Sequence, residues 1–159
     1  MTIPKTFRLV AACCGLALLA PIAQASGKPE DIIKARQAAY QFLAWNTGRV
    51  RANVENPATY DKDTVVKAAN AIAAIANSGL GALYVPGTET GTGYAPTRVK
   101  PEAFDPAQAK KLGEIAGNFN REANALATVA ATGNPAAVKA QLGKLSETCK
   151  ACHDGFRKK

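Results

Sequence analysis

Apolar residues recur at helical spacing through most of the chain after its first 25 residues. Between about residues 29 and 54 they follow a seven-residue repeat, which predicts a long helix with one buried face. Pro29 suits the first turn of this helix, and Asn56-Pro57 is expected to end it. The buried face is expected to hold Ile33, Tyr40, Thr47 and Val54 on one line and Arg36, Leu43 and Val50 on the other.

A second helix is predicted to start near Asp61, a favourable N-cap, and to end at Asn77-Ser78-Gly79. Its expected buried stripe is rich in alanine and consists of Val65, Ala69, Ile72, Ala73 and Ala76. Residues 80–104 follow; they are rich in Gly, Pro and Thr and show no period. A connection of this length in a small domain usually carries function or crosses over a bundle.

Two further helices are predicted, each beginning at an Asx-Pro pair that supplies an N-cap and a first-turn proline. One opens at Asp105-Pro106 and stops at Thr132-Gly133, and the other opens at Asn134-Pro135. The expected inward faces are Leu112, Ile115, Ala116, Phe119, Ala123, Leu126 and Val129 or Ala130, then Val138, Leu142, Leu145, Cys149, Cys152 and Phe156. No segment of the chain shows a β-strand pattern that would compete with these helix predictions. The predicted fold is therefore all-α, an antiparallel four-helix bundle with a long loop between its second and third helices.

Residues 1–25 have the pattern of a secretory signal peptide, with basic residues at Lys5 and Arg8, an apolar run, and the cleavage site Ala23-Gln24-Ala25. The apolar run is too short to span a bilayer, and no stop-transfer segment follows it. A loose likeness of the segment ending at Cys13 to a lipoprotein cleavage box is a weaker alternative, because too little apolar sequence precedes it. We therefore expect one domain, residues 26–159, exported to the periplasm without a membrane span.

The charge balance narrows the class of partner. The chain has 20 basic and 12 acidic residues, and loss of Lys5 and Arg8 with the signal leaves 18 basic residues and a net charge of +6. This balance suits a soluble protein with an acidic partner. The chain lacks the clustered basic stripe and stacking aromatics of a nucleic-acid binder.

The segment Cys149-Lys150-Ala151-Cys152-His153 carries the clearest chemistry. Cys-x-x-Cys-His is the attachment site of one covalent haem c, with two thiols on the vinyl groups and the imidazole on iron. A structural zinc site or an iron–sulfur cluster needs four ligands, and only three Cys or His residues remain after signal removal. A thioredoxin-like pair would open a helix after a strand, and a plain disulfide would leave the position of the chain's one histidine to chance.

The second axial position of the iron has no usual ligand. Electron-carrying c-type cytochromes commonly pair His with Met, but the one methionine is Met1, within the predicted signal. Lysine or tyrosine would be unusual here. Because Cys149, Cys152 and His153 project from one helix face, the haem is expected inside the bundle near one end. The pattern favours five-coordinate, high-spin iron that binds NO or CO.

The chain resembles the cytochrome c′ family, the class II c-type cytochromes, over essentially the whole length of its predicted mature part. The likeness is carried by Arg36-Gln37-Ala38-Ala39-Tyr40, Trp45-Asn46, residues 73–79, Gly81-Ala82-Leu83-Tyr84, residues 97–102 and the C-terminal Cys-Lys-Ala-Cys-His-x-x-Phe-Arg. The resemblance implies a homodimer packed through the first two helices. It also implies that Arg36, Gln37, Thr97 and Arg98 surround the haem and its propionates. For Arg36, the alternative is a surface ion pair with a nearby carboxylate.

The resemblance also implies that Tyr40 covers the distal face of the iron, where many members carry a small aliphatic residue. The alternative is an ordinary core aromatic, and both can hold. Ligand entry would then require Tyr40 to move, and ligand binding could loosen the dimer. Phe156 and Arg157 match positions beside the proximal imidazole, with a solvated C-terminal arginine as the alternative for Arg157.

Three functions follow from these residues. The first is a gas-binding protein that takes up NO. The second is an electron carrier in a respiratory or photosynthetic chain, in which Lys150, Arg157, Lys158 and Lys159 steer an acidic redox partner. The third is an enzymatic activity such as that of a peroxidase. It is the least favoured, because no distal histidine is available to move protons.

Overall fold

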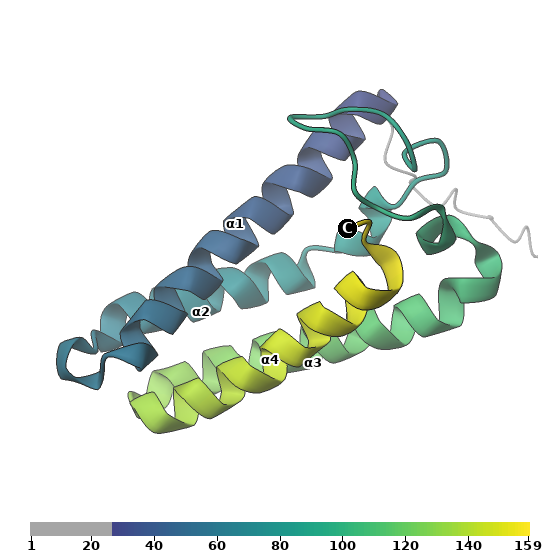
Figure 1. Cartoon of the computed structure of the whole chain (residues 1–159). Helices are drawn as coiled ribbons and strands as arrows, with labels where there is room; N and C mark the ends of the chain where they lie inside the picture. The colour runs from purple at the N-terminus through teal and green to yellow at the C-terminus, as the bar shows by residue number, and fades with distance from the viewer. Residues whose placement is uncertain (1–26) are drawn as a thin grey trace, which may run out of the picture.

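The computed structural model describes residues 27–159, so the predicted signal peptide lies outside the described residues. Four α-helices make up most of this region (Figure 1): α1 (Pro29–Glu55), α2 (Lys62–Asn77), α3 (Ala109–Thr132) and α4 (Pro135–Phe156). The described residues contain two isolated β-bridges and no longer strand. The prediction of an all-α four-helix bundle is confirmed.

The helix starts follow the predicted caps, with one difference. The Asp61 carboxylate accepts hydrogen bonds from the N–H groups of the next turn, and the Asn134 side chain does the same at α4. Asp105 also accepts a backbone hydrogen bond, from Ala107 N–H at 2.8 Å. The turn after it is a 3₁₀ helix (Pro106–Gln108), however, and α3 begins only at Ala109. Such turns are common at helix N-termini, and local sequence signals do not separate them from a first α-turn.

The hydrophobic core fills one half of the bundle. It is built from the C-terminal halves of α1 and α3, the N-terminal half of α4 and residues 65–72 of α2. Its members are Leu43, Val50, Val54, Val65, Ala68, Ala69, Ile72, Ala123, Leu126, Ala130, Val138, Leu142 and Leu145. Alanines on α2 let the neighbouring helices approach closely, so this half is closed.

The other half is open. In Figure 1, α1 and α4 diverge toward the end that carries the C-terminus. Several positions predicted to face the core are therefore not buried, and for these the prediction was wrong. At the open end Tyr40 is 38% exposed, Ala116 is exposed, and Leu112, Ile115, Cys149 and Cys152 are half-buried. Thr47, Ala76 and Phe119 are also only half-buried, although Ala76 and Phe119 pack against the core. The periodicity identified the right face, but at this end much of that face has no opposing helix to contact.

The long connection between α2 and α3 crosses this open end. It contains two further 3₁₀ helices, η2 (Leu80–Leu83) and η3 (Pro101–Phe104). Its last part pairs with the end of α4: Lys100 N–H donates to Phe156 O at 2.9 Å, and Lys158 N–H donates to Arg98 O at 2.7 Å. The loop thus holds the C-terminal turns of α4 in place. Within the described region, no helix combines the length and hydrophobicity needed to cross a membrane.

Candidate haem site

The Cys-x-x-Cys-His motif occupies the last two turns of α4, at the open end of the bundle. Cys149 and Cys152 are free, half-buried thiols, and burial raises the pKa of both. Partial burial and the positive charge of Arg157 lower the pKa of His153. These effects favour a neutral imidazole, the form that ligates iron. Within residues 27–159, no three Cys, His, Asp or Glu side chains converge to hold a bare metal ion.

Arg36 projects from α1 and is only 2% exposed. Its guanidinium donates to Leu83 O at 2.8 Å and to Thr97 Oγ1 at 3.3 Å. It also donates to both oxygens of Thr88, Oγ1 at 3.0 Å and the carbonyl at 2.9 Å. All four contacts reach into the long loop, so Arg36 binds the loop to α1.

No carboxylate in the described part of the chain forms a salt bridge with Arg36, although the charge of Glu89 acts on the guanidinium from a greater distance. The guanidinium lies over the rings of Tyr84 and Phe104, 5.1 and 5.8 Å from their centroids. None of the salt bridges among the described residues involves Arg36, which rules out the surface ion pair considered from the sequence. Burial lowers the pKa of Arg36. A buried cation with only neutral acceptors leaves a position where an anionic group would be stabilised.

Two tyrosines extend this cluster toward the thiols. The hydroxyls of Tyr40 and Tyr84 lie 3.1 Å apart, within hydrogen-bonding distance. Burial is the largest cause that raises the pKa of each phenol, and the Cys152 thiol adds to both shifts. Cys152 therefore lies close enough to both phenols to influence their ionisation. Tyr84 and Thr88 were not singled out as site residues from the sequence.

The side-chain amide of Gln37 is hydrogen-bonded to the long loop. Its amide nitrogen donates to Ala95 O at 2.7 Å, and its amide oxygen accepts from Tyr94 N–H at 2.8 Å. The structure therefore shows a structural contact for Gln37, and its contact with a haem stays a prediction. The same holds for Thr97, whose hydroxyl accepts from Arg36.

The C-terminal residues lie on the other side of His153. Phe156 is buried, and Arg157 is exposed and forms a β-bridge with Val99. The Arg98 guanidinium donates to Lys158 O at 3.2 Å. The predicted proximal residues are therefore close to the motif, with Phe156 packed inside and Arg157 at the surface.

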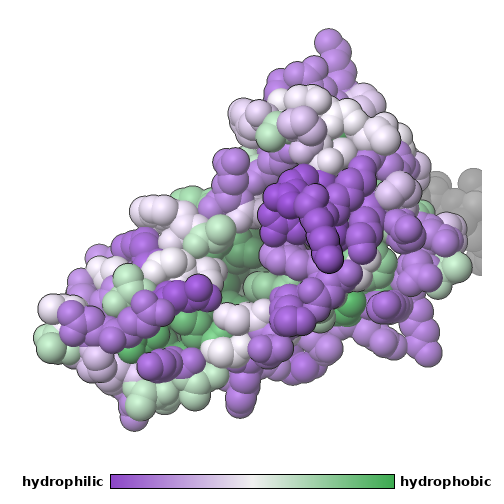
Figure 2. All heavy atoms as spheres, in the orientation of Figure 1, coloured by the Kyte–Doolittle hydropathy of each residue, from purple (hydrophilic) through white to green (hydrophobic). Residues whose placement is uncertain are grey.

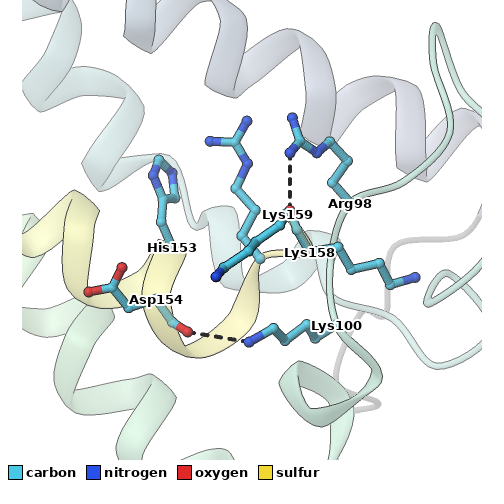
Figure 3. A pocket seen from close by; sticks show the side chains of 7 residues that line it. Arg98, Lys100, His153, Asp154, Lys158 and Lys159 are labelled. Carbon is cyan, nitrogen blue, oxygen red and sulfur yellow. Dashed lines mark hydrogen bonds between the residues drawn. The ribbon is translucent and has the colours of Figure 1, made fainter.

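A basic hollow of about 550 Å³ opens beside His153 (Figure 3). It is lined by Arg98, Lys100, His153, Asp154, Arg157, Lys158 and Lys159. The Lys100 ammonium donates to the carbonyls of Asp154 and Gly155 at 3.3 and 3.1 Å, at the negative end of the α4 dipole. Lys150, which was expected to join this surface, is instead paired with Asp154.

These residues fit a haem better than any competing group. The half-buried apolar positions of α1, α3 and α4 border the open end, and Figure 2 shows hydrophobic surface recessed between the helices. A flat apolar ring attached to Cys149 and Cys152 would cover this surface. Arg36 offers a charge partner for a carboxylate on the rim of that ring. His153 supplies the nitrogen for its metal.

The sequence model of the family described as Cytochrome C′ matches residues 31–157. The chain belongs to the cytochrome c′ family. Cytochrome c′ of Rhodocyclus tenuis is 61% identical over 132 residues, which cover 83% of this chain and 97% of that relative. Family membership implies a covalently bound haem c, in agreement with the motif.

Solved cytochrome c′ structures show the same fold. The crystal structure from Thermochromatium tepidum has a TM-score of 0.78 at 47% identity and covers 85% of this chain and 100% of that chain. A second structure, with a TM-score of 0.79, 49% identity and the same coverage, is described as having an unusual ligand-controlled dimer dissociation. Variants of the Alcaligenes xylosoxidans cytochrome c′, at 29% identity and a TM-score of 0.72, cover 84% and 98% of the two chains; they include a carbon monoxide-bound form and a nitric oxide complex.

Proposed function

We propose that this cytochrome c′ binds NO and CO at a five-coordinate haem attached to Cys149 and Cys152, with His153 as the axial ligand. The observation that carries the proposal is the composition of the space facing the motif. Tyr40 and Tyr84 are neutral phenols joined by a hydrogen bond, Cys152 of the motif influences the ionisation of both, and the chain has no second histidine and no methionine beyond Met1. The haem supplies an iron atom able to bind a diatomic ligand. Structures of a relative with NO and with CO support the same chemistry here.

The residues of this chain have separate roles in the proposal. The two thiols fix the ring to α4, and the His153 imidazole orients the metal. Arg36 holds a propionate from its buried position, and Tyr40 covers the ligand side. Because no second histidine is available as a proton donor or acceptor, we assign no enzymatic reaction to the site.

The optical spectrum of the reduced holoprotein tests this function. We expect a high-spin spectrum before ligand is added and a clear shift when CO or NO is added. A low-spin spectrum of the ligand-free protein would show that a side chain occupies the sixth position. Cys149→Ala and Cys152→Ala variants should each weaken retention of haem under denaturing conditions, whereas Lys150→Ala should not.

Electron transfer is the second candidate, and the basic hollow beside His153 favours it. Five of its seven lining residues are Arg or Lys, and Asp154, whose side chain is the one acidic side chain in the lining, is paired with Lys150. We propose that this surface attracts an acidic redox partner. Reduction by an acidic one-electron carrier should slow as salt rises, and a Lys158→Gln, Lys159→Gln variant should weaken this dependence. A salt-insensitive rate would count against the surface.

We also propose that the protein is an exported homodimer in which α1 contributes to the interface. Phe42 and Trp45 are 51% and 57% exposed on α1, and their rings stack at 5.6 Å. Large exposed aromatics are typical of protein interfaces. Sedimentation with and without CO would measure the dimer, whose ligand-linked dissociation has a precedent in a relative. N-terminal sequencing of the exported protein should begin at Ser26.

A further inference from the structure

The hydrogen bond between Tyr40 and Tyr84 joins α1 to the end of the η2 turn, 44 residues away in sequence. We propose that Tyr84 is a positioning residue, whose hydroxyl holds the Tyr40 phenol over the ligand side of the haem and so limits the rate of gas entry. The inference rests on the proposed gas-binding function and goes further, because it assigns control of access to a residue of the long loop.

Tyr84 is the fixed member of the pair. The Arg36 guanidinium lies over its ring at 5.1 Å, and the Phe104 ring packs beside it with centroids 5.9 Å apart. The backbone is held as well: Tyr84 N–H donates to Gly81 O at 3.1 Å, and Arg36 donates to the carbonyl of Leu83. Contacts on the ring and on both ends of the Leu83–Tyr84 peptide group restrict the position of the Tyr84 hydroxyl.

Tyr40 is the movable member. It stands on α1 at the open end of the bundle, and its side chain is more exposed than that of Tyr84. The Tyr84 hydroxyl is the one hydrogen-bond partner of the Tyr40 hydroxyl among residues 27–159. A rotation of the Tyr40 side chain away from the haem therefore breaks this one bond and leaves the helix unchanged.

The size of the effect follows from this single bond. A hydrogen bond between neutral groups typically changes an equilibrium by a factor of about 2 to 10. If the covered state predominates, loss of the bond raises the fraction of open sites by that factor. The apparent association rate and affinity for CO then rise together. The dissociation rate stays the same, because the bond is already broken in the liganded protein.

The Tyr84→Phe variant tests the proposal, because it keeps the ring contacts with Arg36 and Phe104 and removes the hydroxyl. We expect CO to bind the ferrous holoprotein about 2 to 10 times faster, with an unchanged dissociation rate. The matched control is Tyr94→Phe, which removes an exposed hydroxyl that makes no hydrogen bond to the described residues, and it should leave both rates unchanged.

A double-mutant cycle with Tyr40→Phe separates this role from a general loosening of the site. Tyr84→Phe should have no further effect on CO association once Tyr40 lacks its hydroxyl. In urea unfolding of the ferric holoprotein, the double variant should lose less stability than the sum of the single losses. Additive effects in both measurements would overturn the proposal.

The possible failures are distinguishable. If the wild-type protein does not bind CO, both the gas-binding function and control of gas entry are refuted. If the wild type binds CO and Tyr84→Phe has wild-type association kinetics, the positioning role alone is refuted. A faster Tyr84→Phe variant whose dissociation rate rises equally would also contradict it, because the bond would then be acting in the liganded state.

Discussion

Replacement of Arg36 by methionine tests how the open end of the bundle is held together. Methionine matches much of the arginine side chain in length and keeps its apolar stem, but it removes the guanidinium. Four hydrogen bonds to the long loop are lost, two of them to Thr88. Since Thr88 is 1% exposed, water cannot easily replace the lost donor at its carbonyl.

The expected loss of stability combines two opposing effects. Four hydrogen bonds at about 1 kcal/mol each would contribute about 4 kcal/mol. Removal of the buried charge of Arg36 relieves a desolvation cost on the order of 1–2 kcal/mol. The free energy of unfolding of Arg36→Met should therefore fall by about 2–3 kcal/mol. Arg36→Lys should lie between the two proteins, because an ammonium group cannot reach all four acceptors in one plane.

Urea unfolding followed by circular dichroism would measure these differences, and amide hydrogen exchange would show where they arise. Exchange should speed up in residues 85–98 before it changes in the closed core. The control is Arg49→Met, because Arg49 makes one long hydrogen bond and lies over the exposed Trp45 ring. It should lose less than about 1 kcal/mol. Equal losses at Arg36 and Arg49 would refute the assignment of the four bonds.

Three further predictions concern the helices and the phenols. Leu126→Ala removes a fully buried core side chain and should lower the free energy of unfolding by about 3 kcal/mol; the same change at half-buried Leu112 should cost clearly less. Gly133→Ala should cost about 1 kcal/mol in thermal unfolding, since φ is +73° where α3 ends, and a wild-type melting temperature would contradict this. Burial raises the pKa of Tyr40 and Tyr84, so the folded state keeps their protons and stability should fall as pH rises above about 10. Tyrosinate absorbance should then rise together with loss of helix, and ionisation with the helix content intact would contradict the burial.

Features that depend on near neighbours in sequence could be predicted. Asp61 and Asn134 cap helices through hydrogen bonds to groups two or three residues away, so their roles are visible in a short window. The same is true of the haem-attachment motif, whose residues share one face of α4 because of helical spacing. Hydrogen bonds and spacing within about one helical turn were therefore sufficient to predict these features.

Features that depend on the loop could not be predicted from the residues alone. Thr88 and Tyr84 lie in a segment without periodicity, and their contacts with α1 are 44 or more residues away in sequence. The burial of Tyr40 and Ala116 was overestimated for a related reason: a hydrophobic stripe shows which face points inward, but not whether an opposing side chain meets it there. The hydrogen bonds from Arg36 to the distant loop could not be predicted either. The sequence showed only that a charged residue lies on an apolar line of the first helix.

The width of the open end is set by the loop more than by helix packing, because α1 packs mainly against α2 and α4 mainly against α3. Arg36 binds Thr97 on the α1 side, and Lys100 pairs with Phe156 on the α4 side. The three Cα–Cα steps from Thr97 to Lys100 span at most about 10 Å when the chain is extended. The segment from Thr97 to Lys100 therefore links the two walls of the site at a limited separation. The position of Tyr84 is tied to the same arginine, so the loop that limits the separation of the walls also holds the hydroxyl that restrains Tyr40.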